Sequence, residues 1–150
     1  MVAAAVAPAA IGSAGADFES RWYRRLRKPA WQPSGATIGL VWSCLYTLTA
    51  IAGSLLWRRR EEGRGGRGGL LWTLFAAQSA LNAAYTPLLT RRRDLVLATV
   101  DSGLLCATVA ALALAAWSRR RLAGVLLLPY VAWTAFATFL SATLVRLNRS

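Results

Sequence analysis

Long apolar stretches separated by short polar segments divide this sequence into five candidate membrane helices. Crossing a bilayer as a helix takes roughly 20 predominantly apolar residues. Because backbone exposed to lipid must satisfy its hydrogen bonds within the segment, each stretch is expected to be helical. The pattern predicts an all-α membrane protein, a five-transmembrane-helix bundle that forms a single domain over 1–150. The expected helices cover 2–16, 36–57, 70–90, 95–117 and 122–145.

The first stretch is the shortest candidate span, because 2–16 has only 15 residues and a span usually needs at least about 17. As a span, it must extend into the next segment, thin the membrane locally, or have lost residues at its start. Alternatively it is a signal peptide, since Ala14-Gly15-Ala16 looks like a small-residue cleavage site. The absence of a positively charged beginning argues against that alternative.

The first polar segment, 17–35, mixes charges with large aromatic residues. Trp22 and Leu26 are four residues apart, so a short amphipathic helix would direct both towards the membrane domain. Pro29 and Pro33 would end this helix and stiffen the link to the next span. The segment therefore predicts an ordered first loop, although an aromatic belt at the membrane interface would also explain its composition.

Two stripes run along the stretch 70–90. Gln78, Asn82 and Thr86 recur every four residues, and such a polar stripe turns inward in lipid, to bond neighbouring helices or to line a cavity. The second stripe has small side chains that allow close helix contact, within the chain or in a homodimer interface. It consists of Ala76, Ala80 and Ala84.

Asp101 is a carboxylate about two turns into the fourth long stretch. An ionisable residue inside a membrane is a functional candidate. Asp101 is also close enough to the end of its span to reach interfacial water or an arginine, and the sequence favours neither interpretation.

Composition narrows the possible functions. Of the residues, 56% are hydrophobic, and the net charge is +12. The 18 basic residues lie outside the apolar stretches, where they anchor helices and attract lipid headgroups, so nucleic acid is not an expected partner. Cys44 and Cys106 lie inside apolar stretches and are expected to be buried free thiols. The chain has no histidine, so neither a metal site nor hydrolytic acid–base chemistry is expected.

Four motifs occur in the order of a known family. They are WYRRLRKPAWQP at 22–33, WSCLY at 42–46, QSALN at 78–82 followed by Thr86-Pro87, and PYVAW at 129–133. Together they resemble the translocator protein family, also called the tryptophan-rich sensory proteins or the peripheral-type benzodiazepine receptor. The resemblance covers nearly the whole chain and is strongest to the bacterial members of the family. It therefore implies a bacterial membrane rather than the mitochondrial outer membrane.

The resemblance implies a function as well as a fold. Members are five-helix bundles, often homodimers, with a pocket that opens towards the first loop and takes porphyrins, haem-type tetrapyrroles, sterols and benzodiazepine-type ligands. Tryptophans matching Trp22, Trp42 and Trp133 are implicated in porphyrin binding and light-dependent breakdown. No cofactor is required, since porphyrin or haem is the ligand. The expected ligand-binding residues are Trp22, Trp42, Tyr46, Asn82, Tyr85, Trp133 and Ala137.

The sequence departs from the family pattern at several positions. Ser34 replaces a proline, Tyr85 stands where many members have tryptophan, and Ser141 replaces a common asparagine. Leu88 and Leu89 stand where many members have aromatic residues. The C-terminal tail has no tyrosine, which puts the family's cholesterol motif in doubt.

The leading hypothesis is therefore a membrane protein that binds tetrapyrroles, or sterol-like apolar molecules, as a sensor or transporter. Indole faces stack on planar rings, and without a histidine ligand to iron the binding should rest on ring contact. We expect Trp22, Trp42 and Trp133 to converge on one pocket beneath the first loop. The alternative is an enzyme that breaks down porphyrin with light and oxygen, with Trp42 and Trp133 as catalytic residues. A third possibility is a structural membrane protein whose tryptophans serve as belts and packing.

Overall fold

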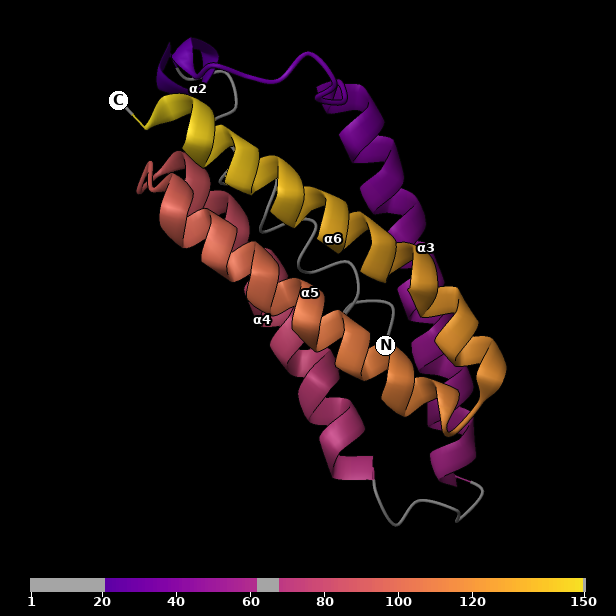
Figure 1. The fold of residues 1–150 in the computed structure, drawn as a ribbon. Coiled ribbons are helices and arrows are strands. Elements are labelled where there is room, and N and C mark those ends of the chain that lie inside the picture. The colour runs from indigo at the N-terminus through magenta and orange to yellow at the C-terminus, as the bar shows by residue number, and fades with distance from the viewer. Residues whose placement is uncertain (1–20, 62–67, 150) are drawn as a thin grey trace.

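The computed structural model describes residues 21–61 and 68–149, and within them it contains helices and no strand (Figure 1). Four long helices lie where the sequence predicts them, each beginning or ending within a few residues of the expected bounds. The expected first span, 2–16, falls outside the described residues. The elements are α2 Arg21–Arg25, α3 Gly35–Glu61, α4 Gly68–Thr90, α5 Leu95–Trp117 and α6 Arg121–Asn148.

The long helices lie side by side, with α5 and α6 as the central pair. α5 packs against α6 on one side and α4 on the other, and α6 in turn packs against α3. The short helix α2 lies at the end of the bundle where α6 ends (Figure 1). This arrangement places the loop that precedes α3 over one end of the helices.

Three of the described helices are long and apolar enough to cross a membrane: Gly35–Arg58, Leu95–Trp117 and Arg121–Asn148. α4 is long enough, but Gln78 and Asn82 in its centre lower its hydropathy. The helix is inserted among its neighbours in spite of these amides, because both side chains are buried and hydrogen-bonded within the protein. The all-helical membrane bundle is thus confirmed, with three candidate spans in the described part of the chain.

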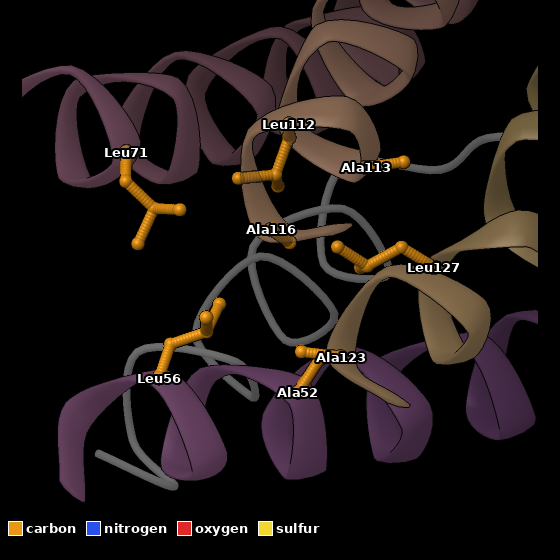
Figure 2. Close-up of a cluster of buried hydrophobic side chains, with 8 residues drawn as sticks. All are labelled: Ala52, Leu56, Leu71, Leu112, Ala113, Ala116, Ala123 and Leu127. Atoms are coloured by element: carbon orange, nitrogen blue, oxygen red, sulfur yellow. The ribbon is translucent and has the colours of Figure 1, made fainter. Parts of the chain in front are cut away.

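An apolar cluster joins all four long helices at the end away from α2 (Figure 2). Half of its members are alanines, whose small side chains allow helix backbones to approach closely. Gly124 lies in the same region, and a Cβ atom there would come within 2.8 Å of the Trp117 Cα. The α5–α6 turn is therefore packed backbone against backbone. The cluster consists of Ala52, Leu56, Leu71, Leu112, Ala113, Ala116, Ala123 and Leu127.

Side chains cap the beginnings of two helices at the α2 end. Asp94 precedes α5, and its Oδ1 accepts hydrogen bonds from the backbone N–H groups of Val96 and Leu97. Ser34 precedes α3, and its Oγ accepts a hydrogen bond from the Thr37 N–H at 3.2 Å. Such caps satisfy backbone donors that the first helical turn leaves unpaired. Ser34, which replaces the family's proline, therefore caps the beginning of α3.

Candidate functional site

A directed chain of hydrogen bonds crosses the interior between α3, α4 and α6. The Tyr46 hydroxyl donates to Asn82 Oδ1 at 3.1 Å, and Asn82 Nδ2 donates to the Tyr130 hydroxyl at 2.7 Å. Tyr130 donates to Gln78 Oε1 at 2.9 Å, and Gln78 Nε2 donates to Ser79 Oγ at 2.8 Å. Buried polar groups are costly unless they are paired. The chain of bonds therefore allows two amides to sit inside an otherwise apolar bundle.

This arrangement confirms that Gln78 and Asn82 turn inward, as the four-residue stripe predicts. Thr86, the third residue of the stripe, is half-buried. The partners of the stripe lie on α3 and α6, so the amides bond neighbouring helices. Tyr46 and Asn82, which are expected ligand-binding residues, bond to each other here, and their contact with a ligand stays a prediction.

Aromatic rings surround the chain of hydrogen bonds. Trp42 stacks on Tyr46 with ring centroids 5.5 Å apart, and it forms a T-shaped pair with Tyr130 with ring centroids 5.9 Å apart. Tyr130 is only 1% exposed and belongs to a buried cluster with Leu45, Leu105 and Val109. Such ring pairs contribute roughly 0.5–1.5 kcal/mol each beyond the burial of their area.

Trp133 packs against this same buried cluster. Its ring also meets Phe136 at 5.3 Å. Among the described residues, the buried indole Nε1 of Trp133 has no hydrogen-bond acceptor. A buried N–H without a partner is uncommon and calls for an explanation, such as a bound molecule. Trp133 therefore presents both an aromatic face and an unused donor.

The first loop reaches α6 through Trp31. This ring stacks on Phe139 at 5.5 Å and meets Phe136 edge-on at 5.9 Å, and Phe136 in turn contacts Trp133. Trp31 remains 45% exposed. A continuous set of aromatic contacts thus leads from the loop surface to the buried indole of Trp133.

A polar pair lies beside Trp31 in the same loop. Gln32 Nε2 donates to the Tyr23 hydroxyl at 3.3 Å, whereas the buried Gln32 Oε1 has no donor within the described part of the chain. Burial raises the pKa of Tyr23, and the hydrogen bond from Gln32 opposes that shift. The Tyr23 hydroxyl is therefore neutral at physiological pH. Lys28 Nζ lies 4.1 Å from the centroid of the same ring, a cation–π contact.

The loop is fastened to the end of α6 by Asn148. Its Oδ1 accepts a hydrogen bond from the Arg27 N–H at 2.9 Å, and its Nδ2 donates to the Arg27 carbonyl at 3.0 Å. Two bonds to one backbone unit fix both position and orientation. This contact confirms that the loop is ordered over the part that the structure describes.

Two of the departures from the family pattern contact each other. The Tyr85 hydroxyl and Ser141 Oγ lie 2.9 Å apart and share a hydrogen bond between α4 and α6. The hydroxyl pair gives a direct link between the two helices. Tyr85 is half-buried, and its contact with a ligand stays a prediction.

Of the three tryptophans expected to converge on one pocket, two lie against the same part of the core, and the pocket itself stays a prediction. Trp42 and Trp133 flank one buried cluster. Trp22 is half-buried in α2, and among the described residues its ring makes no aromatic contact with either. Trp31 is the loop tryptophan that stacks on α6, so its place in the site was missed from the sequence. Ala137 is half-buried one turn after Trp133.

Phe136 and Tyr130 were also missed as site residues, although the spacing contains a signal for both. They lie three residues after and three residues before Trp133 on the same helix, a spacing that puts side chains on neighbouring surface positions. Trp31 has no comparable signal, because its position depends on how the loop folds back.

The small-residue stripe lies on the outer surface of α4. Ala76 and Ala80 are exposed, and Ala84 is half-buried. The stripe suggests an interface either within the chain or in a homodimer. Ala76 and Ala80 do not pack within the described part of the chain. Cys44 is exposed and Cys106 is half-buried, and both are free thiols. The expected burial of Cys44 is therefore wrong, because it lies on a face of α3 that no described helix covers.

Asp101 is buried on α5, at 7% exposure. Its Oδ2 accepts no hydrogen bond from the described residues. The sequence left two interpretations open, a functional carboxylate or one that reaches interfacial water or an arginine. This geometry does not support the second. The carboxylate turns towards the interior of the bundle.

Known proteins are similar to this chain over nearly its whole length. The match to the TspO/MBR family covers residues 2–147. The chain is 34% identical over 131 residues to the tryptophan-rich protein TspO of Bacillus cereus, covering 87% of this chain and 83% of that protein. It is 35% identical over 128 residues to the human translocator protein, covering 85% and 75% respectively.

A third relative extends the match nearly to both ends. It is the tryptophan-rich sensory protein of Cereibacter sphaeroides, which is 31% identical over 147 residues, covering 98% of this chain and 88% of that protein. This chain belongs to the TspO/MBR family of membrane proteins.

Proposed function

We propose that this protein binds tetrapyrroles such as protoporphyrin or haem, and sterol-like apolar molecules, as a membrane sensor or transporter. The observation that carries the proposal is the Trp133 indole, whose buried N–H has no acceptor among the described residues. Around it are flat aromatic surfaces of the kind that planar ligands stack on. Ligand sites typically combine such apolar walls with a few polar groups that orient the ligand.

The proposed site lies between the buried cluster and the first loop. Trp42 and Trp133 provide the deeper surfaces, and Phe136 and Trp31 lead towards the loop. A hydrogen-bond acceptor on the ligand would pair with the Trp133 N–H. A hydrogen-bond donor on the ligand would pair with Gln32 Oε1. The sequence contains no histidine, so the binding of haem would rest on ring contacts rather than on a histidine–iron bond.

Direct titration of the purified protein tests this function. Protoporphyrin and haem should shift their Soret bands on binding at one site per chain, and a sterol should compete with them. Metal-free protoporphyrin should bind about as well as haem, because iron is not needed for ring stacking. If none of the three ligands binds saturably, the tryptophans are packing and interfacial residues.

A second function is favoured by the contacts of Trp42. Its ring meets Tyr46 and Tyr130, which begin and continue the chain of hydrogen bonds to Gln78. Oxidisable rings in contact can pass an electron to a light-excited porphyrin, with oxygen as the final oxidant. Trp42 and Trp133 would then be catalytic residues in porphyrin breakdown. Chromatography of the products after matched light and dark incubations separates this function from binding alone.

We also infer five membrane passes in a bacterial membrane and a homodimer. The match to the family begins at residue 2, which supports a first pass over 2–16, and α4 fits as a pass because its amides are paired inside. Five passes place the two termini on opposite sides of the membrane. Fusing a reporter to each terminus tests the number of passes, because an even number would give both fusions the same side.

A further inference from the structure

Asp101 is a buried acidic group that the proposed tetrapyrrole site does not use. We propose that Asp101 anchors a second kind of ligand, an apolar molecule that carries a protonated primary amine. The proposal does not depend on tetrapyrrole binding. It starts from the Oδ2 atom, which is enclosed and accepts no hydrogen bond from any described residue, in a side chain that is 7% exposed.

The hydroxyl groups of Thr99 and Ser102, which flank Asp101 in the sequence of α5, are already hydrogen-bonded. Thr99 Oγ1 donates to the Leu95 carbonyl at 2.7 Å. Thr138 Oγ1 donates to the Thr134 carbonyl at 2.8 Å, so in the 3.0 Å pair between Ser102 and Thr138 it is Ser102 that donates. Each hydroxyl has a single proton. Neither Thr99 nor Ser102 can therefore satisfy the carboxylate without losing its present partner.

No residue of α5 itself carries a positive charge. Within the described residues, Asp101 forms no ion pair, and the arginines of the α4–α5 turn, Arg91, Arg92 and Arg93, are exposed at the end of the bundle. An ionised carboxylate in a protein interior needs both a compensating charge and hydrogen-bond donors. A protonated primary amine supplies both at once, because it carries one charge and three N–H donors. A hydroxyl would supply a donor without the charge.

The depth of Asp101 suits the head of an amphiphile. Asp101 is six residues after Leu95, the first residue of α5, which at 1.5 Å per residue places it about 9 Å into the helix. Leu105 lies one turn deeper on the same face and belongs to the buried cluster that Trp133 packs against. An ammonium head at Asp101 would thus direct its apolar tail towards that cluster. The exposed arginines lie near water, where salt screens their repulsion of the entering cation within about 8 Å.

The test compares two probes of equal chain length, dodecylamine and dodecanol. The thermal unfolding midpoint of the purified full-length protein is measured in a nonionic detergent at increasing concentrations of each. A ligand that binds only the native state raises that midpoint further as its concentration exceeds its dissociation constant. We expect dodecylamine to raise the midpoint of the wild type, with an apparent affinity at least tenfold above that of dodecanol. Equal effects of the two probes on the wild type would overturn the proposal without any variant.

Two substitutions on the same helix complete the test. Asp101→Asn keeps the shape and removes the charge, and it should lower the apparent affinity for dodecylamine at least tenfold. Asp94→Asn makes the same charge change at the half-buried cap of α5, where asparagine also caps well, and it should leave the affinity unchanged. Equal losses in both variants would show general surface electrostatics and contradict a site at Asp101.

Protoporphyrin binding is measured in parallel to separate this proposal from the proposed function. Asp101→Asn should bind protoporphyrin within twofold of the wild type. If Asp101→Asn loses both ligands to the same extent, the carboxylate supports the structure of the bundle and is not an amine site. If the wild type binds dodecylamine but not protoporphyrin, the amine site stands and the tetrapyrrole function fails.

Discussion

The Asn82 amide donates to the Tyr130 hydroxyl at 2.7 Å, across the space between α4 and α6. Each of the two residues has a further partner, Tyr46 for Asn82 and Gln78 for Tyr130. The pair thus holds three helices together around a buried polar centre. Hydrogen bonds between membrane helices average about 0.6 kcal/mol, but the cost of breaking this one is larger, because the groups left behind stay buried.

Replacing Tyr130 with phenylalanine should destabilise the protein. The change removes the acceptor of Asn82 and the donor to Gln78, which leaves two buried amides short of a partner at a cost of about 1–3 kcal/mol. Thermal unfolding in detergent measures the loss. Tyr46→Phe is the matched comparison, since Tyr46 makes one bond in the chain and should cost less. A Tyr130→Phe midpoint equal to that of the wild type would show that the chain of bonds adds nothing to stability.

Gly124→Ala tests the close packing of the α5–α6 turn. The added Cβ would lie 2.8 Å from both the Cα and the Cβ of Trp117, so the backbone must shift. Overpacking of this kind typically costs about 1–3 kcal/mol. Gly39→Ala on α3 is the control, because a Cβ at Gly39 meets nothing within 4 Å. The unfolding midpoint should fall in the first variant only, and equal midpoints would mean that the turn adapts freely.

Asn148→Ala should loosen the first loop. It removes both hydrogen bonds to the Arg27 backbone. The Arg27–Lys28 bond should then be cut by trypsin several times faster, because proteases act on locally opened segments. Thr143→Ala, which removes an exposed hydroxyl bonded within its own helix, should leave the cleavage rate unchanged. Equal rates in Asn148→Ala and the wild type would mean that other contacts hold the loop.

Ala80→Leu should weaken the proposed homodimer. Ala76 and Ala80 are exposed on α4, where their small side chains let a second helix approach closely. The substitution adds bulk to that face without entering the interior, so the monomer should keep its unfolding midpoint. Crosslinking between protomers in membranes measures the effect, and Leu104→Ala, on an exposed face of α5, is the control. Undiminished crosslinking would place the interface on another helix.

The long helices could be predicted from the sequence because their apolar stretches are uninterrupted and end in arginines or glycines. The inward turn of Gln78 and Asn82 could also be predicted, since an amide facing lipid would be unpaired. Their partners could not, because pairing with Tyr46 and Tyr130 depends on which helices are neighbours. The bundle packs α3 on α6 and α4 on α5, and that order is absent from any local pattern.

The structure of the first loop could also be predicted only in part. Its aromatic composition and prolines predict order, and the short helix expected there forms around Trp22 but ends at Arg25, one residue before Leu26. The choice of Trp31 over Trp22 as the ring that stacks on α6 depends on how the chain bends after Pro29. Asn148 fixes that bend from 121 residues away along the sequence, and contacts of this range leave no periodic signal.

Protoporphyrin binding by Trp133 variants tests the central claim most directly. Trp133→Phe keeps the aromatic face and removes the N–H, so it should bind roughly 2–13-fold more weakly, as the loss of one hydrogen bond of about 0.5–1.5 kcal/mol implies. Trp133→Ala removes the ring as well and should bind more weakly still. Trp57→Phe, at the opposite end of the bundle, is the control and should bind like the wild type. If folded Trp133→Ala binds protoporphyrin as tightly as the wild type, the indole is a packing residue and the proposed site is wrong.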